Sequence, residues 1–144
     1  MDLGVPDSGQ LAQIMSQATA PAFVLGAVAA FIAVLLGRMT VVLDRIRSLN
    51  EIADGDAVRA HLKSDIPRLR QRAKLLNSAV YLALSSGICT SLLLVVGFAS
   101  AFFRLRHEYG AGILFALAIG LLGGSLFRFA QEVRIGLSEF DHYR

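Results

Sequence analysis

Three stretches of the chain contain no charged residue, and their lengths suit the thickness of a lipid bilayer. They comprise residues 20–37, 77–103 and 111–127. A helix needs about 20 mostly apolar residues to cross the hydrocarbon core. In lipid, only helices and closed barrels satisfy all their backbone polar groups. The sequence therefore predicts an all-α integral membrane protein with three transmembrane helices, formed by residues 1–144 as a single membrane domain.

The composition agrees with this class. The 144 residues are 55% hydrophobic and 17% charged, whereas about 25% of the residues in a soluble domain are charged. The charges gather in blocks between the apolar stretches. We expect an external N-terminal segment over 1–19, a cytoplasmic segment over 38–76, an external loop over 104–110 and a cytoplasmic tail over 128–144.

The positions of the cationic residues predict the orientation. Of the 14 Lys and Arg residues, nine lie within 38–76, three lie in the tail, two lie in the 104–110 loop, and none precedes the first span. With three spans, the 38–76 segment and the tail share one side of the membrane, and the side richer in Lys and Arg is the cytoplasmic one. We therefore expect a multi-pass protein with its N-terminus outside and its C-terminus in the cytoplasm.

Apolar residues recur every three or four positions after the first span and before the second. They form two seams: Val42, Ile46, Leu49 and Ala53, then Ile66, Leu69, Ala73, Leu76 and Val80. Such spacing predicts one apolar face on each helix. Asp54-Gly55-Asp56 ends the first helix, Pro67 suits the start of the second, and 56–64 can form a short helix between them. We expect helices 1 and 2 to extend into an antiparallel helical hairpin over 38–76, named here the stalk; the alternative is a loosely ordered basic loop.

Two rows of small residues predict close helix packing. The first span carries Ala22, Gly26, Ala29 and Ala33, and the third carries Gly112, Ala116, Gly120 and Gly124. One row can pack inside the subunit, between the first and third spans, which leaves the other for a second copy. We therefore predict a homo-oligomer; the alternative is that the two rows pack on each other within a monomer.

Charged residues cluster at the expected cytoplasmic boundary. They are Arg38, Asp44, Arg45, Arg128 and Glu132. We expect Arg38 or Arg45 to pair with Glu132, and Asp44 to pair with Arg128. The alternative is that each arginine extends toward lipid phosphate.

No pattern in the sequence predicts catalysis, a cofactor or a metal. The single cysteine, Cys89, lies in an apolar run, and His61, His107 and His142 lie in three separate polar segments. We find no carboxylate pair outside the loops and no nucleotide-binding loop. The second and third spans lack the acidic or histidine side chains that proton-coupled carriers place in the membrane. We expect neither an enzyme nor a nucleic-acid-binding protein.

Several segments together resemble a known family. They are residues 11–14, 21–31, 35–39, 44–49 and 70–76, with the Ser- and Thr-bearing second span, and the 37–49 block is the strongest of them. Over about residues 10–135 the chain resembles the bacterial integral-membrane family known as domain of unknown function 2721. The resemblance implies a bacterial inner-membrane protein and implies no activity.

Two functions fit these observations. In the first, the protein is a homo-oligomeric structural or regulatory subunit, and its basic stalk docks a cytoplasmic or membrane protein partner or the anionic lipid face. In the second, it is a homo-oligomeric ion channel or pore, lined by first spans, with a ring of Arg38 side chains at its cytoplasmic mouth.

Overall fold

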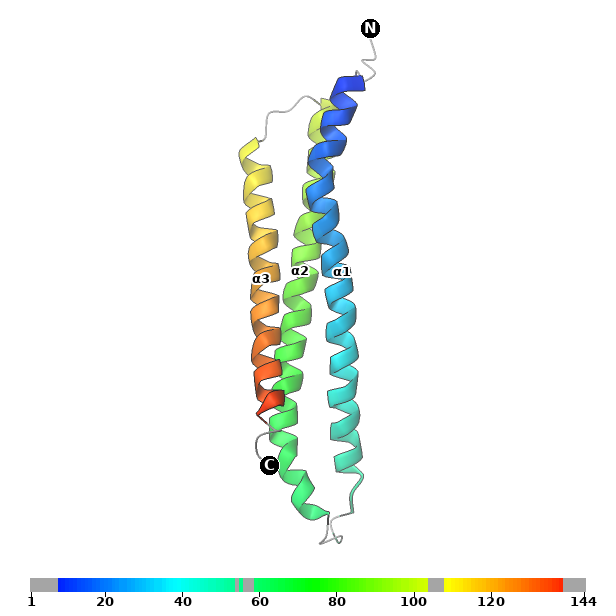
Figure 1. The fold of residues 1–144 in the computed structure, drawn as a ribbon, viewed down its shortest axis with the longest axis vertical. Coiled ribbons are helices and arrows are strands. Elements are labelled where there is room, and N and C mark those ends of the chain that lie inside the picture. Colours follow the sequence, from blue (N-terminus) through cyan, green and yellow to red (C-terminus); the bar gives the residue numbers. More distant parts are fainter. Residues whose placement is uncertain (1–7, 54, 56–58, 104–107, 139–144) are drawn as a thin grey trace.

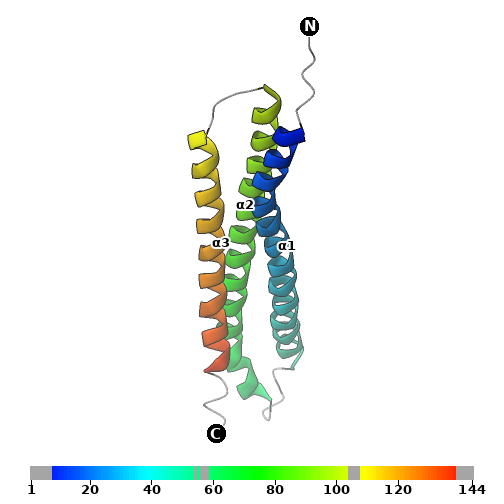
Figure 2. The same cartoon turned by 45° about the horizontal axis from the view of Figure 1, so that its top comes forward.

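Three long helices lie side by side, each antiparallel to the next (Figure 1). The computed structural model describes residues 8–53, 55, 59–103 and 108–138. These residues form helix α1 (Ser8–Asn50), the short 3-10 helix η1 (Ala60–Asp65), helix α2 (Ile66–Phe103) and helix α3 (Glu108–Leu137). Helix α2 packs along both α1 and α3, whereas α1 and α3 meet only over a short stretch (Figure 1, Figure 2). The other two helices are therefore held mainly by α2.

The helices are longer than the charge-free stretches that predicted them. Helix α1 already begins at Ser8, and it continues without a break through Pro21, which is buried. Residues 8–19 thus belong to the same helix as the first span. Helix α3 continues past Phe127 to Leu137, so the first part of the predicted tail is helical.

The connections differ in detail from the predictions. Between α1 and α2 the structure has a 3-10 helix over Ala60–Asp65, and α2 then begins at Ile66 with Pro67 in its first turn. That position suits proline, because the first turn of a helix has no use for its missing N–H. Residues 56–58 of the short helix predicted over 56–64, and residues 104–107 of the predicted external loop, lie outside the described residues.

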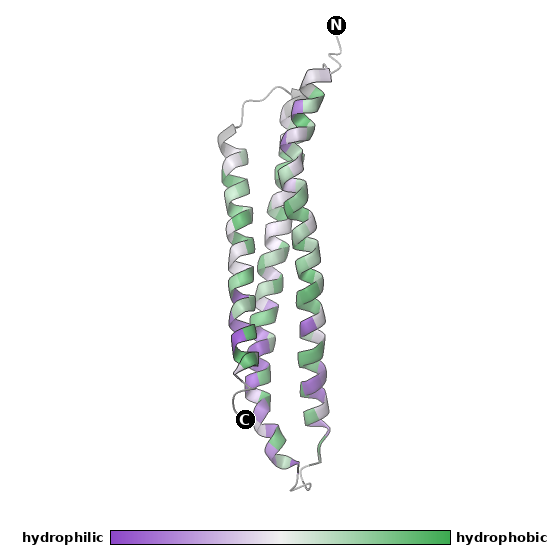
Figure 3. Cartoon of the chain, in the orientation of Figure 1, coloured by the Kyte–Doolittle hydropathy of each residue, from purple (hydrophilic) through white to green (hydrophobic). Residues whose placement is uncertain are grey.

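All three helices are long and apolar enough to cross a membrane. In the most apolar 18-residue stretch of each helix, only a small share is buried inside the molecule: 17% for α1, 28% for α2 and 11% for α3. Large apolar side chains therefore face outward, such as Phe23, Tyr81 and Ile113, each at least 65% exposed. Polar residues gather toward the end that holds the α1–α2 connection (Figure 3). An outer surface of this kind needs lipid around it.

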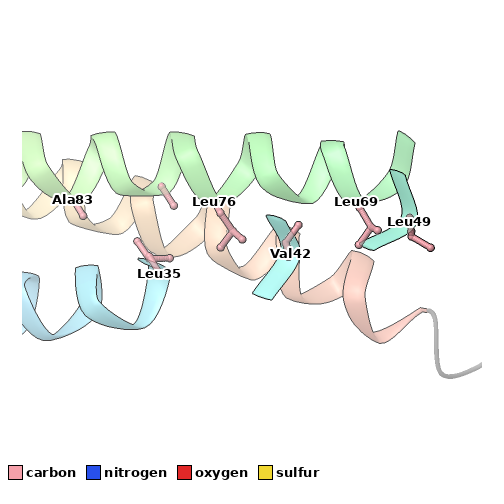
Figure 4. Packing of buried hydrophobic residues seen from close by; sticks show 7 residues of the cluster. Leu35, Val42, Leu49, Leu69, Leu76 and Ala83 are labelled. Atoms are coloured by element: carbon pink, nitrogen blue, oxygen red, sulfur yellow. The ribbon is translucent and has the colours of Figure 1, made fainter. Parts of the chain in front are cut away.

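The packing between α1 and α2 follows a seven-residue repeat. Val28, Leu35, Val42 and Leu49 are buried on α1, and Leu69, Leu76 and Ala83 are buried on α2. Figure 4 shows these residues except Val28. Seven residues make about two helical turns, so such a row stays on one side of a gently supercoiled helix. The two predicted seams meet in one core cluster, with Ile46, Ile66, Ala73 and Val80 packed against it. Ala53, predicted to end the first seam, lies beyond α1 and is exposed.

We predict that Leu49→Asp lowers the melting temperature of the protein in mild detergent, whereas Arg47→Gln leaves it nearly unchanged. Leu49 is 2% exposed, and burying a leucine contributes about 1.5–3 kcal/mol, to which an unpaired charge in the same place would add its own cost. Arg47 is exposed and pairs with Asp44 of its own helix. Surface pairs contribute only about 0.2–1 kcal/mol. Equal melting temperatures for the two variants would contradict the packing of this seam.

Candidate functional site

Buried hydroxyl groups join α2 to α3. Ser86 Oγ donates a hydrogen bond of 2.7 Å to the carbonyl oxygen of Ala118, and Ser125 Oγ donates one of 2.6 Å to the carbonyl oxygen of Ala79. The serines and alanines are fully buried. These small residues let the two backbones approach closely enough for side-chain hydroxyls to reach the neighbouring carbonyls. The two bonds lie seven residues apart on both helices, which defines one antiparallel register.

The next step of this register brings two charged residues together. Seven residues beyond Ser125 lies Glu132, and seven residues before Ala79 lies Arg72. Arg72 Nε donates a hydrogen bond of 2.9 Å to Glu132 Oε1, and Arg72 Nη2 also lies 2.9 Å from that oxygen. The Glu132 side chain is fully buried, and that of Arg72 is 14% exposed. The buried ion pair thus follows the two hydroxyl hydrogen bonds as the next contact in the same register.

Helix α1 contributes the third member of the cluster. Arg38 Nε lies 3.3 Å from Glu132 Oε2. The same guanidinium lies 5.4 Å from the centre of the Phe129 ring, a cation–π distance. Phe129 in turn makes an edge-to-face contact of 5.6 Å with Phe31. Glu132 of α3 therefore contacts both other helices, with Arg38 of α1 at its Oε2 atom and Arg72 of α2 at its Oε1 atom.

The two arginines offset part of the cost of burying the Glu132 carboxylate. A buried carboxylate without cations around it would lose its hydration with nothing in return. Two permanently charged guanidiniums flank Glu132 and replace that hydration. Among the described residues, its Oε2 atom accepts no hydrogen bond and meets Arg38 only as an ion pair. Removing either arginine would leave the carboxylate less compensated, so the three side chains act as one unit.

A second arginine of α2, Arg68, binds the C-terminal end of α3. Arg68 Nη2 donates hydrogen bonds to the carbonyl oxygen of Ile135, at 3.1 Å, and to Ser138 Oγ. The last carbonyls of a helix have no partner inside it, and a cation near them is favourable. At Gly136, a Cβ atom would lie 3.1 Å from Arg72 Nη2, so glycine leaves room for the ion pair.

The structure brings together only part of the predicted charge cluster. Arg38 reaches Glu132, as one of the expected pairs requires. Asp44 lies 3.5 Å from Arg47 of its own helix. Arg45 and Arg128 are exposed. No ion pair between Asp44 and Arg128 occurs within the described part of the chain.

Sequence reasoning missed Arg72, the closest partner of Glu132. In the sequence, Arg72 is one of nine cations within 38–76, and the small-residue row of the third span follows a four-residue period. The informative signal is a seven-residue period, because Ala118, Ser125 and Glu132 on α3 mirror Arg72, Ala79 and Ser86 on α2.

The two small-residue rows lie mainly on the outer surface, unlike the buried residues that recur every seven positions. Ala22, Gly26, Ala29, Ala33, Gly112, Ala116 and Gly120 are all exposed. At Gly26, Gly112 and Gly120 a Cβ atom would meet nothing within 4 Å. Only Gly124 approaches a neighbour, since its Cβ would lie 3.6 Å from Leu82 Cδ1. The two rows therefore do not pack on each other inside the subunit.

We predict strong coupling between Arg72 and Glu132 in a double-mutant cycle. Arg72→Gln or Glu132→Gln alone should each destabilise the protein by about 3–5 kcal/mol, because each leaves a buried charge with fewer partners. The double variant should be destabilised by about 1–3 kcal/mol less than the sum of the two single variants. Unfolding in mild detergent measures these energies. The control cycle uses Asp44→Asn and Arg128→Gln, for which we expect no coupling. A zero value for Arg72 and Glu132 as well would contradict the buried pair.

Comparison with known proteins places the chain in a family. A family model described as a protein of unknown function (DUF2721) matches residues 18–142. The matched stretch includes Arg38, Arg72 and Glu132 and most of each helix. The comparisons with curated proteins and with solved structures gave no match. The predicted resemblance is thus confirmed, and the chain belongs to the DUF2721 family.

Proposed function

We propose that the protein is a homo-oligomeric structural or regulatory subunit of the bacterial inner membrane. It has no catalytic activity of its own in this proposal, and it uses no cofactor. Its basic stalk docks a cytoplasmic or membrane protein partner with an acidic surface. The observation that carries the proposal is the outward position of both small-residue rows.

Small residues on an outer helix surface are well suited to binding another helix. Lipid chains gain little from a flat row of glycine and alanine, whereas a second helix can approach along it and gain close van der Waals contact. Gly26 and Gly120 both have open space around them. Each subunit thus offers one such row on α1 and one on α3, which supports assembly of several copies.

The stalk offers a fixed surface for a partner. Leu49, Leu69 and Leu76 are buried between its helices, so its charged side chains stand on a packed support. Its exposed cations are Arg45, Arg47, Arg59, Arg70 and Lys74. Charge complementarity with an acidic surface would speed association and help to select the partner.

The channel alternative receives less support. A pore with an Arg38 ring needs the Arg38 side chain to face the axis of the oligomer. In the structure, Arg38 contacts Glu132 and the Phe129 ring of its own subunit. These contacts hold part of the Arg38 side chain against its own subunit, whereas both small-residue rows face outward, so the subunit role is the better-supported function.

The proposed orientation predicts the behaviour of reporter fusions. With the N-terminus outside and the stalk in the cytoplasm, a reporter that works only in the periplasm should be active on the N-terminus and silent on the C-terminus. The physical reason is the excess of Lys and Arg in the stalk and the tail. Activity from the C-terminal fusion alone would reverse the proposed topology.

We predict that Gly26→Ile or Gly120→Ile lowers the oligomeric state measured by native mass spectrometry in mild detergent. Both positions have open space within the subunit, so isoleucine should disturb only a contact between copies. Gly97→Ile is the matched control, since Gly97 also has open space and lies in neither row. A monomeric wild type, or an unchanged state in both variants, would overturn the oligomer. Conductance of the wild-type oligomer in a planar bilayer would instead favour the channel.

A further inference from the structure

A groove of about 480 Å³ lies beside the charged cluster. Its lining residues come almost entirely from α1, with one arginine from α2: Ala33, Val34, Gly37, Arg38, Val41, Val42 and Arg72. The volume is within the range of about 300–1,000 Å³ that is typical of ligand sites. One part of the groove is thus cationic, and the rest is apolar.

Arg38 has donors to spare at this groove. Its Nε atom lies 3.3 Å from Glu132 Oε2 as an ion pair, and within the described residues that oxygen accepts no hydrogen bond. Its side chain is 40% exposed. A guanidinium carries five N–H donors in a planar fork, which matches the oxygens of a phosphate. An anionic oxygen from outside the chain would therefore complete the partners of Arg38.

The apolar walls indicate what kind of molecule carries that oxygen. Val34 and Val41 are large apolar residues that are 52% and 69% exposed. They belong to α1, one of the helices that is apolar enough to cross a membrane. These exposed valines already need lipid around them, so a lipid is well placed to reach Arg38 along the same surface. A molecule with a phosphate and a hydrocarbon chain would contact both the arginine and the valines.

We propose that this groove binds one anionic phospholipid from the leaflet nearest the stalk. The lipid phosphate accepts hydrogen bonds from Arg38, and an acyl chain covers Val34 and Val41. Gly37 lines the groove without a side chain and leaves space for the glycerol region. A zwitterionic lipid would bring an ammonium or choline group toward Arg38 and Arg72, so a lipid with net negative charge is preferred.

The test measures lipid retained on the purified full-length protein. Native mass spectrometry would follow titration with phosphatidylglycerol, and in parallel with phosphatidylcholine of the same acyl chains. We expect tighter binding of phosphatidylglycerol to the wild type. Arg38→Gln should weaken it about fivefold, the effect expected for one cation near a lipid surface. Arg47→Gln removes the same charge from an exposed position of α1 outside the groove and should not weaken it.

A second variant fills the groove and leaves the charged cluster untouched. Gly37→Leu places a side chain in the groove, where a Cβ atom meets nothing within 4 Å, so the fold should tolerate it. We expect it to weaken phosphatidylglycerol binding at least as much as Arg38→Gln. Gly97→Leu, at a glycine with equal space outside the groove, should bind like the wild type.

Three outcomes would overturn the proposal. The first is wild-type binding by both Arg38→Gln and Gly37→Leu. The second is equal retention of phosphatidylcholine and phosphatidylglycerol. The third is competition by millimolar inorganic phosphate that removes the lipid preference, which would identify a site for small anions. Because the readout is bound lipid, a monomeric wild type would contradict the proposed oligomer and leave this inference standing.

Discussion

The antiparallel seven-residue register of α2 is the constraint on which the rest of the structure depends. One side of α2 presents leucine and alanine to the buried row of α1, and another presents serine, alanine and arginine to the buried row of α3. On all three helices the buried contact residues lie seven positions apart, so the contacts between helices recur about every two turns. The hydroxyl bonds and the ion pair are successive steps of the same row. A shift of α3 by one turn would separate all of them at once.

The two interfaces of α2 use different physical interactions. Its contact with α1 is mainly apolar, with leucine, valine and alanine side chains buried between the two helices. Its contact with α3 uses small residues, hydroxyl-to-carbonyl hydrogen bonds and a buried charge pair. In lipid the hydrophobic effect between helices is absent, so such contacts become the means of specific association. Glu132 lies in the C-terminal part of α3, which ends at Leu137. A charge near the end of a candidate membrane helix costs less than one at its middle.

The sequence predicted the helices and the stalk seams well, because both depend on local patterns. Charge-free stretches identify spans directly, and the spacing of Val42, Leu49, Leu69 and Leu76 identifies the faces that meet. Of the charged cluster, only the pair of Arg38 and Glu132 could be predicted from the sequence. Arg38 and Glu132 stand out as charges beside apolar runs, whereas Arg72 resembles the other stalk cations until the register between helices is known. The small-residue rows recur at helical spacing, yet spacing alone cannot tell an outer surface from an inner one.

The limited contact between α1 and α3 has a consequence for biosynthesis. Synthesis from the N-terminus completes α1 and α2 first, and these two helices can pack together before α3 has been made. In that hairpin, Arg38 and Arg72 still lack the carboxylate of Glu132. Glu132 lies near the end of the last helix. Its negative charge therefore reaches Arg38 and Arg72 only when α3 packs against the first two helices. A chain that ends before Glu132 would lack the carboxylate that Arg38 and Arg72 share in the folded protein.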